Sequence, residues 1–139
     1  MNVASQYRRN SVSGKSNTGL VVLLYDRLIC TLFAAMAAIE AGCIEARGKE
    51  MGHAIRILGH LQATLDFAAG GDVAESLNKF YAMAMFQIVR ISALQEIDSL
   101  KQLIAQVAAI SEAWREVERQ EVHPRSSAGY QINSRVNTG

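Results

Sequence analysis

Hydrophobic positions recur every three or four residues along four long segments of this chain, and this spacing predicts four amphipathic helices. The first helix is expected to begin at Asn17 or Thr18, because either side chain can accept a hydrogen bond from a free helix N–H group. It should end at Ala41, because Gly42 readily adopts the left-handed conformation that stops a helix. A second helix is expected over about residues 45–67.

Two breaks delimit the remaining helices. The glycine pair at 70–71 interrupts the pattern, and Asp72 can cap a third helix. A single helix over 72–120 would be about 70 Å long, far beyond the usual length. We therefore expect a short turn near Ser92–Gln95, followed by a fourth helix that stops before Pro124.

Helices of about 20 residues with short connections pack as an antiparallel bundle. The expected fold is therefore all-α, an antiparallel four-helix bundle over residues 18–121. Residues 1–17 and 122–139 lack helical periodicity, so we interpret them as a flexible N-terminal arm and a disordered tail.

The first and third helices carry more apolar residues than a single buried face requires. The surplus either lies in a deeper core or forms a groove that receives a partner segment, and periodicity does not distinguish these two interpretations. For a groove, the candidate partner contacts are Val22, Ile29, Phe33, Met36, Met83 and Phe86.

Composition and charge narrow the functional classes. Half of the 139 residues are hydrophobic and one is proline, which favours helix and excludes a disordered chain. The longest apolar run, Leu28–Ile39, is shorter than the roughly 20 residues that span a bilayer, so we expect a buried helix and no membrane insertion. The net charge of +1, with basic ends around a mildly acidic body, does not indicate a nucleic-acid face. Two cysteines and a polar N-terminus without a secretory signal favour the reducing cytosol.

Few side chains are candidates for catalysis or metal binding. Glu50 and His53 have the Glu-x-x-His spacing of di-iron bundles, but no second copy of the motif completes a metal shell. His53 and His60 lie two turns apart on one helix face beside Arg56, as in a phosphotransfer bundle, yet surface histidines are the simpler interpretation. Cys30 lies among apolar residues and is expected to be a buried, inert thiol. We therefore expect no catalytic residue, no metal and no cofactor.

Six short motifs follow one another along the chain. They are YRRNSV at 7–12, LLYD at 23–26, AIEAG at 38–42, LQATLDFAAGG at 61–71, LNKFY at 77–81 and EAWREV at 112–117. Together, and in this order, they resemble the flagellin-specific export chaperone family of the FliS type. The chain departs from the family pattern at Arg27, where a glycine usually follows Leu-Tyr-Asp.

The resemblance implies an all-helical bundle without catalysis in the bacterial cytosol. Members of this family bind the disordered C-terminal segment of flagellin, prevent its premature polymerisation and present it to the flagellar type III export gate. Flagellin and export-gate components are therefore the partners that the resemblance implies. Because the N-terminal arm packs on the bundle in this family, Tyr7 is expected to occupy the groove until the client displaces it.

Two other interpretations remain open. One is a histidine phosphotransfer or metal-binding bundle that uses Glu50, His53 or His60. The other is a homodimer in which the surplus apolar stripes of two copies cover each other.

Overall fold

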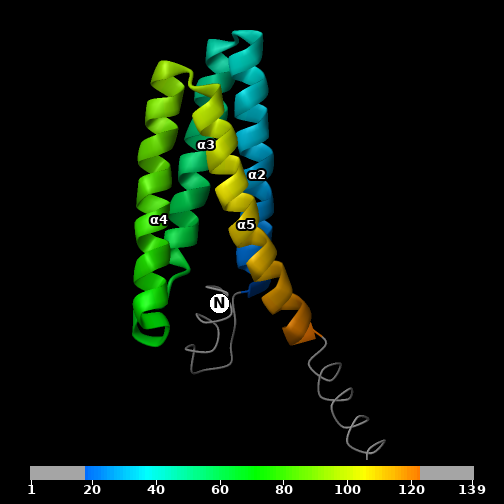
Figure 1. The fold of residues 1–139 in the computed structure, drawn as a ribbon, viewed down its shortest axis with the longest axis vertical. Helices are drawn as coiled ribbons and strands as arrows, with labels where there is room; N and C mark the ends of the chain where they lie inside the picture. Colours follow the sequence, from blue (N-terminus) through cyan, green and yellow to red (C-terminus); the bar gives the residue numbers. More distant parts are fainter. Residues whose placement is uncertain (1–17, 123–139) are drawn as a thin grey trace, which may run out of the picture.

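The computed structural model describes residues 18–122, and these residues fold into four helices without a strand (Figure 1). The helices are α2 (Thr18–Ala41), α3 (Ile44–Ala63), α4 (Phe67–Leu94) and α5 (Ile97–Val122). Successive helices run in opposite directions, which confirms the all-α antiparallel four-helix bundle. The predicted arm at 1–17 lies outside the described residues, and so does the predicted tail at 122–139 except for Val122, which is the last residue of α5.

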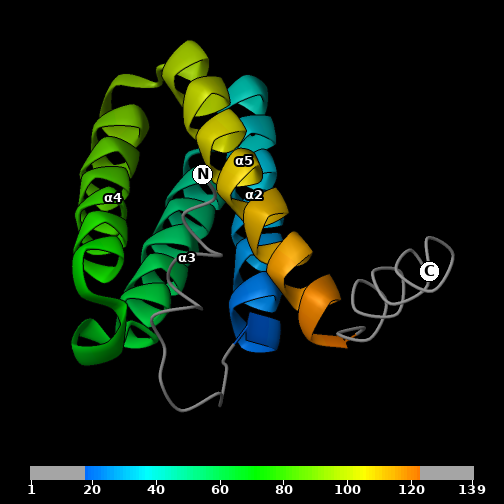
Figure 2. The same cartoon turned by 60° about the horizontal axis from the view of Figure 1, so that its bottom comes forward.

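The four helices are unequally paired. α2 packs against both α3 and α5, and α3 packs against α4. By contrast, α4 and α5 have little contact and diverge from the turn that joins them, as Figures 1 and 2 show from two directions. α2 and α4 have no direct backbone contact and occupy opposite corners of the bundle. Their outward faces therefore point to different sides of the molecule.

The core is built from one side of each helix. Leu28, Leu32, Leu58 and Leu100 are fully buried, as the spacing of three and four residues predicts. A polar pair lies in the same core, where the hydroxyl groups of Tyr25 and Tyr81 form a hydrogen bond of 2.8 Å. This bond links α2 to α4 across the bundle, although the two helices do not touch along their backbones.

The predicted end of the first helix is confirmed, but the predicted end of the second helix and start of the third are wrong. Gly42 has φ +71°, the left-handed conformation predicted to end α2. However, α3 ends at Ala63 rather than near residue 67, and α4 begins at Phe67 rather than after Asp72. The reason is a cap that the sequence analysis overlooked: the Asp66 side chain accepts a hydrogen bond from the N–H group of Ala69, at 3.1 Å.

The predicted glycine break persists as a kink inside α4. Gly71 has φ 54° and ψ −129°, so the helix is interrupted there and then continues. The turn between the last two helices is confirmed at the end of the predicted segment. Gln95 adopts a left-handed conformation with φ 55°, and its N–H group donates to the Ile91 carbonyl oxygen at 2.6 Å.

Candidate functional site

The outward face of α4 carries a row of exposed apolar side chains. Met83, Phe86 and Val89 follow one another at intervals of three residues, which places them along one side of the helix. All three are exposed, and Phe86 reaches 70%. The core-facing side of the same helix is filled by other residues, such as Tyr81 and Ile88. We call Met83, Phe86 and Val89 the α4 stripe.

A second row lies on the outward face of α2, away from both α3 and α5. We call it the α2 stripe, and it consists of Leu20, Leu23, Cys30, Phe33, Ala34 and Ala37, all exposed. Phe33 is 50% exposed. The prediction that Cys30 is buried is wrong, because this position faces away from the helices that pack on α2.

α2 also has the composition of a membrane span. Among the described residues it is the one helix that is long and apolar enough, by length and composition, to cross a membrane. The core helix of a soluble protein passes the same test, and one side of α2 does form core with α3 and α5.

The structure separates the predicted partner contacts. Phe33 is exposed in the α2 stripe, and Met83 and Phe86 are exposed in the α4 stripe. Ile29 and Met36 are partly buried and pack against the core. They differ from Val22, which is only 6% exposed and belongs to the core itself.

These residues do not line one groove, because α2 and α4 lie at opposite corners. The candidate surface therefore consists of two stripes. Tyr7 lies outside the described residues, and the role of each residue in partner binding stays a prediction.

Sequence reasoning identified Phe33 in the α2 stripe but missed its two leucines. Leu20 and Leu23 are both exposed, at 40% and 53%. They lie three residues apart and outside the buried series that contains Leu24 and Leu28. That spacing was the available signal, since residues three apart share a helix face.

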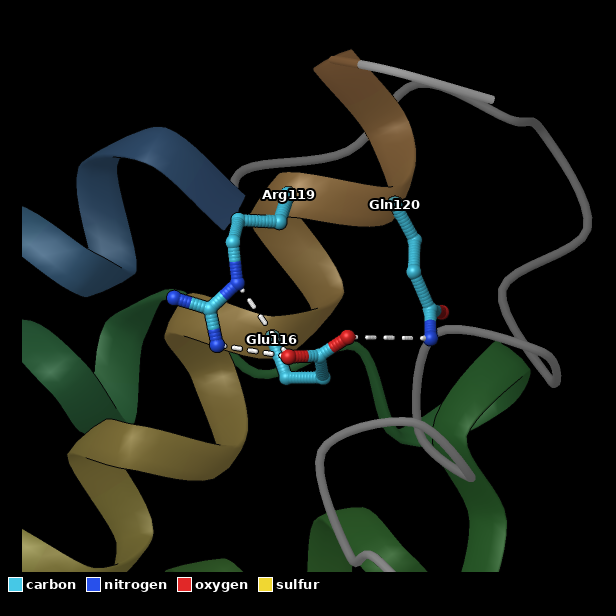
Figure 3. A network of polar contacts seen from close by, with 3 residues as sticks. All are labelled: Glu116, Arg119 and Gln120. Atoms are coloured by element: carbon cyan, nitrogen blue, oxygen red, sulfur yellow. Dashed lines mark hydrogen bonds and ion pairs between the residues drawn. The ribbon is translucent and has the colours of Figure 1, made fainter. Parts of the chain in front are cut away.

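The exposed side of α5 is mostly polar, in contrast to the two stripes. Near its end, Arg119 donates from Nε and Nη2 to one oxygen of Glu116, at 3.2 and 2.5 Å, and Gln120 donates to the other oxygen at 3.5 Å (Figure 3). The hydrogen bond and positive charge of Arg119 lower the pKa of Glu116, and the carboxylate raises the pKa of Arg119. A second ion pair, between Arg115 and Asp26, holds α5 against α2.

The residues proposed for metal or phosphotransfer chemistry do not form a metal cluster. Across residues 18–122, no group of three or more His, Cys, Asp or Glu side chains is placed to hold a metal ion. His53 and His60 instead line a small depression between α2 and α3, together with Arg27 and Arg56.

Comparison with known proteins links this fold to one family. A family model described as "Flagellar protein FliS" matches residues 1–121.

Three relatives bear the name flagellar secretion chaperone FliS. The Salmonella typhimurium protein is 25% identical over 109 residues, 78% of this chain and 81% of the relative. The Vibrio cholerae protein is 27% identical over 108 residues, 78% of this chain and 79% of the relative. The Campylobacter jejuni protein is 29% identical over 116 residues, 83% of this chain and 90% of the relative. The resemblance carried by the six motifs is confirmed, and the chain belongs to the FliS family of flagellar proteins.

Proposed function

We propose that this chain is a flagellar secretion chaperone that works in the bacterial cytosol and catalyses no reaction. Its client is the C-terminal segment of flagellin, which the bundle keeps from polymerising and delivers to the flagellar type III export apparatus. The names of the relatives support the chaperone role, and the exposed apolar stripes support a polypeptide client.

The observation that carries the proposal is the grouping of exposed apolar side chains on α2 and α4. Grouped aromatic and aliphatic side chains on a protein surface usually mark a site where a partner binds. Phe33 and Phe86 are each at least half exposed, although their helices already bury a full apolar face on the other side. The surplus apolar surface is therefore available to another chain.

A client without stable structure suits such surfaces. It can fold into helices against the chaperone as it binds, and the burial of apolar area then favours the complex. The ordering of the client opposes binding, so the net affinity stays low enough for later release. A chaperone that has to hand its client to an export apparatus needs both properties.

The placement of the stripes favours a long client over a compact one. Because α2 and α4 lie at opposite corners, a segment that contacts both stripes has to pass around the bundle. A flexible, extended segment can follow such a path. In the free chaperone, Tyr7 of the N-terminal arm would cover part of this apolar surface, and the loaded chaperone would then meet export-gate components.

Isothermal titration calorimetry of the full chain with flagellin tests the proposal. We expect saturable binding of intact flagellin and no binding of flagellin that lacks its C-terminal segment. Equal heats for the two flagellins, or no heat with either, would contradict the proposed client.

A matched pair of variants tests the surface. Phe86 in the α4 stripe and Ile44 at the start of α3 are both 70% exposed, but Ile44 lies outside both stripes. We expect Phe86→Asp to weaken flagellin binding by about tenfold or more, as the loss of a central aromatic contact does. Ile44→Asp should leave the affinity unchanged. Circular dichroism of both variants shows whether the helices are retained.

A further inference from the structure

A small depression between α2 and α3 is lined mainly by basic side chains. Its volume is about 220 Å³, and its lining residues are Leu24, Arg27, His53, Arg56, Ile57 and His60. The depression lies apart from the α4 stripe but beside the α2 stripe, because Arg27 lies between Leu23 and Cys30 at intervals of four and three residues. The inference drawn from it does not depend on the proposed flagellin binding.

The two helices bring these basic groups together by their spacing. His53, Arg56 and His60 follow one another at intervals of three and four residues, so they share one side of α3. Arg27 faces them from α2, on the other side of the depression. The apolar residues of the lining, Leu24 and Ile57, are each only 5% exposed and belong to the core below.

Nothing in the described part of the chain neutralises these side chains. The side chains of Arg27, His53, Arg56 and His60 form no hydrogen bond or ion pair with any residue of 18–122. No acidic residue lines the depression. Asp26, the neighbour of Arg27 in sequence, is paired with Arg115 on the α5 side of α2.

A glycine leaves room beside one of the guanidinium groups. A Cβ atom at Gly52 would lie 3.7 Å from Nη1 of Arg56. The Arg56 side chain therefore extends back along α3 toward Gly52, one turn earlier in the helix. Its N–H groups remain available for a ligand in the depression.

We propose that this depression binds the phosphate group of a phosphate monoester. The two guanidinium groups carry two positive charges, which match the charge of about −1.5 to −2 on such a group near neutral pH. The planar fork of arginine fits pairs of phosphate oxygens, and imidazole N–H groups add further donors. A single carboxylate would be satisfied by one arginine and would leave the other unpaired.

Titration of the isotope-labelled full chain, followed by two-dimensional NMR at constant ionic strength, tests the site. The probes are inorganic phosphate, O-phosphoserine and adenosine monophosphate, which represent the free ion, a phosphorylated protein side chain and a nucleotide. We expect saturable shifts of backbone signals around residues 24–27 and 52–60 with O-phosphoserine or adenosine monophosphate, and binding of inorganic phosphate alone would contradict a monoester site. The probe that binds most tightly identifies the source of the phosphate group.

Three variants separate a specific site from general attraction. Arg27→Gln and Arg56→Gln should each weaken binding by about tenfold or more, because each removes a charge-assisted hydrogen bond. Lys101→Gln, which removes one exposed charge on α5, should leave it unchanged. The absence of saturable shifts with all three probes would overturn the proposal. So would an equal loss in Lys101→Gln, or equally tight binding of the dicarboxylate glutarate.

Discussion

The hydroxyl pair of Tyr25 and Tyr81 makes the bundle core sensitive to alkaline pH. Burial raises the pKa of Tyr25 from 10.0 to about 12, because the phenolate would lose its hydration inside the protein, while the hydrogen bond with Tyr81 partly opposes this shift. The folded state therefore holds the Tyr25 proton more tightly than the unfolded chain does. The resulting contribution to stability is fully present below pH 10 and is lost as the pH rises through about 12.

We predict that the free energy of unfolding falls by about 2 kcal/mol between pH 10 and pH 12 through this one group, out of about 2.7 kcal/mol over the whole titration. Urea unfolding of the wild type and of Tyr25→Phe, measured at several pH values, checks this. The variant lacks the titrating hydroxyl group, so the difference between the two proteins should shrink or reverse over this range. Parallel pH profiles for the two proteins would show that Tyr25 does not titrate as expected.

Individual residues also show why the candidate site was only partly predictable from the sequence. Nearly every residue from Leu28 to Ile39 is apolar, so the sequence pattern alone does not tell which side of that helix faces the core. The exposed Phe33 was identified as a candidate contact, but Cys30 was expected inside and is exposed. Val22 was a candidate surface residue and is buried. The rotation of α2 depends on where α3 and α5 pack, which a single helix does not encode.

At the scale of the helices, glycine and capping residues explain both the correct and the incorrect boundaries. Gly42 marks the end of α2 because its left-handed φ is easily reached by glycine. The start of α4 was harder to predict, because Asp66 and Asp72 are both acceptable caps on either side of the glycine pair. The structure uses Asp66, and the later glycine becomes a kink rather than an end.

Two glycine substitutions that create no steric clash separate backbone strain from helix propensity. A Cβ atom at Gly42 or at Gly48 would meet nothing within 4 Å, so neither alanine is excluded by packing. Of these two glycines, only Gly42 has a positive φ, at +71°, whereas Gly48 lies inside α3. We predict that Gly42→Ala lowers the free energy of unfolding by about 1 kcal/mol. Gly48→Ala should instead raise it by up to about 1 kcal/mol, because alanine favours helix over glycine.

Thermal and urea unfolding of these two variants provide the measurement. Because the two glycines have different backbone conformations, the two substitutions should change the free energy of unfolding in opposite directions. A similar loss in both variants would indicate that the turn at Gly42 imposes no special backbone requirement.

At the scale of the whole molecule, the pairing of the helices determines how a client can bind. α2 and α4 each bury one face and expose another, and the exposed faces lie at opposite corners of the bundle. Because α4 and α5 pair weakly, the outline of the bundle is uneven, and α5 leans away from α4 in both views (Figures 1 and 2). The fold could be predicted from periodicity, but this separation of the stripes could not, because it depends on which helices become neighbours.

The separation leads to a prediction about energies. Phe33 and Phe86 share no contact, so a client that wraps around the bundle should lose binding energy independently at the two positions. We expect Phe33→Asp and Phe86→Asp each to weaken flagellin binding, and the double variant to lose the sum of the two free energies within about 0.5 kcal/mol.

Calorimetry with the same flagellin measures all three, and urea unfolding verifies that the variants remain folded. If one single variant binds normally, the client uses only one stripe. If the double variant loses no more than the weaker single variant, the two residues report one shared change in the bundle, and the wrapped arrangement is wrong.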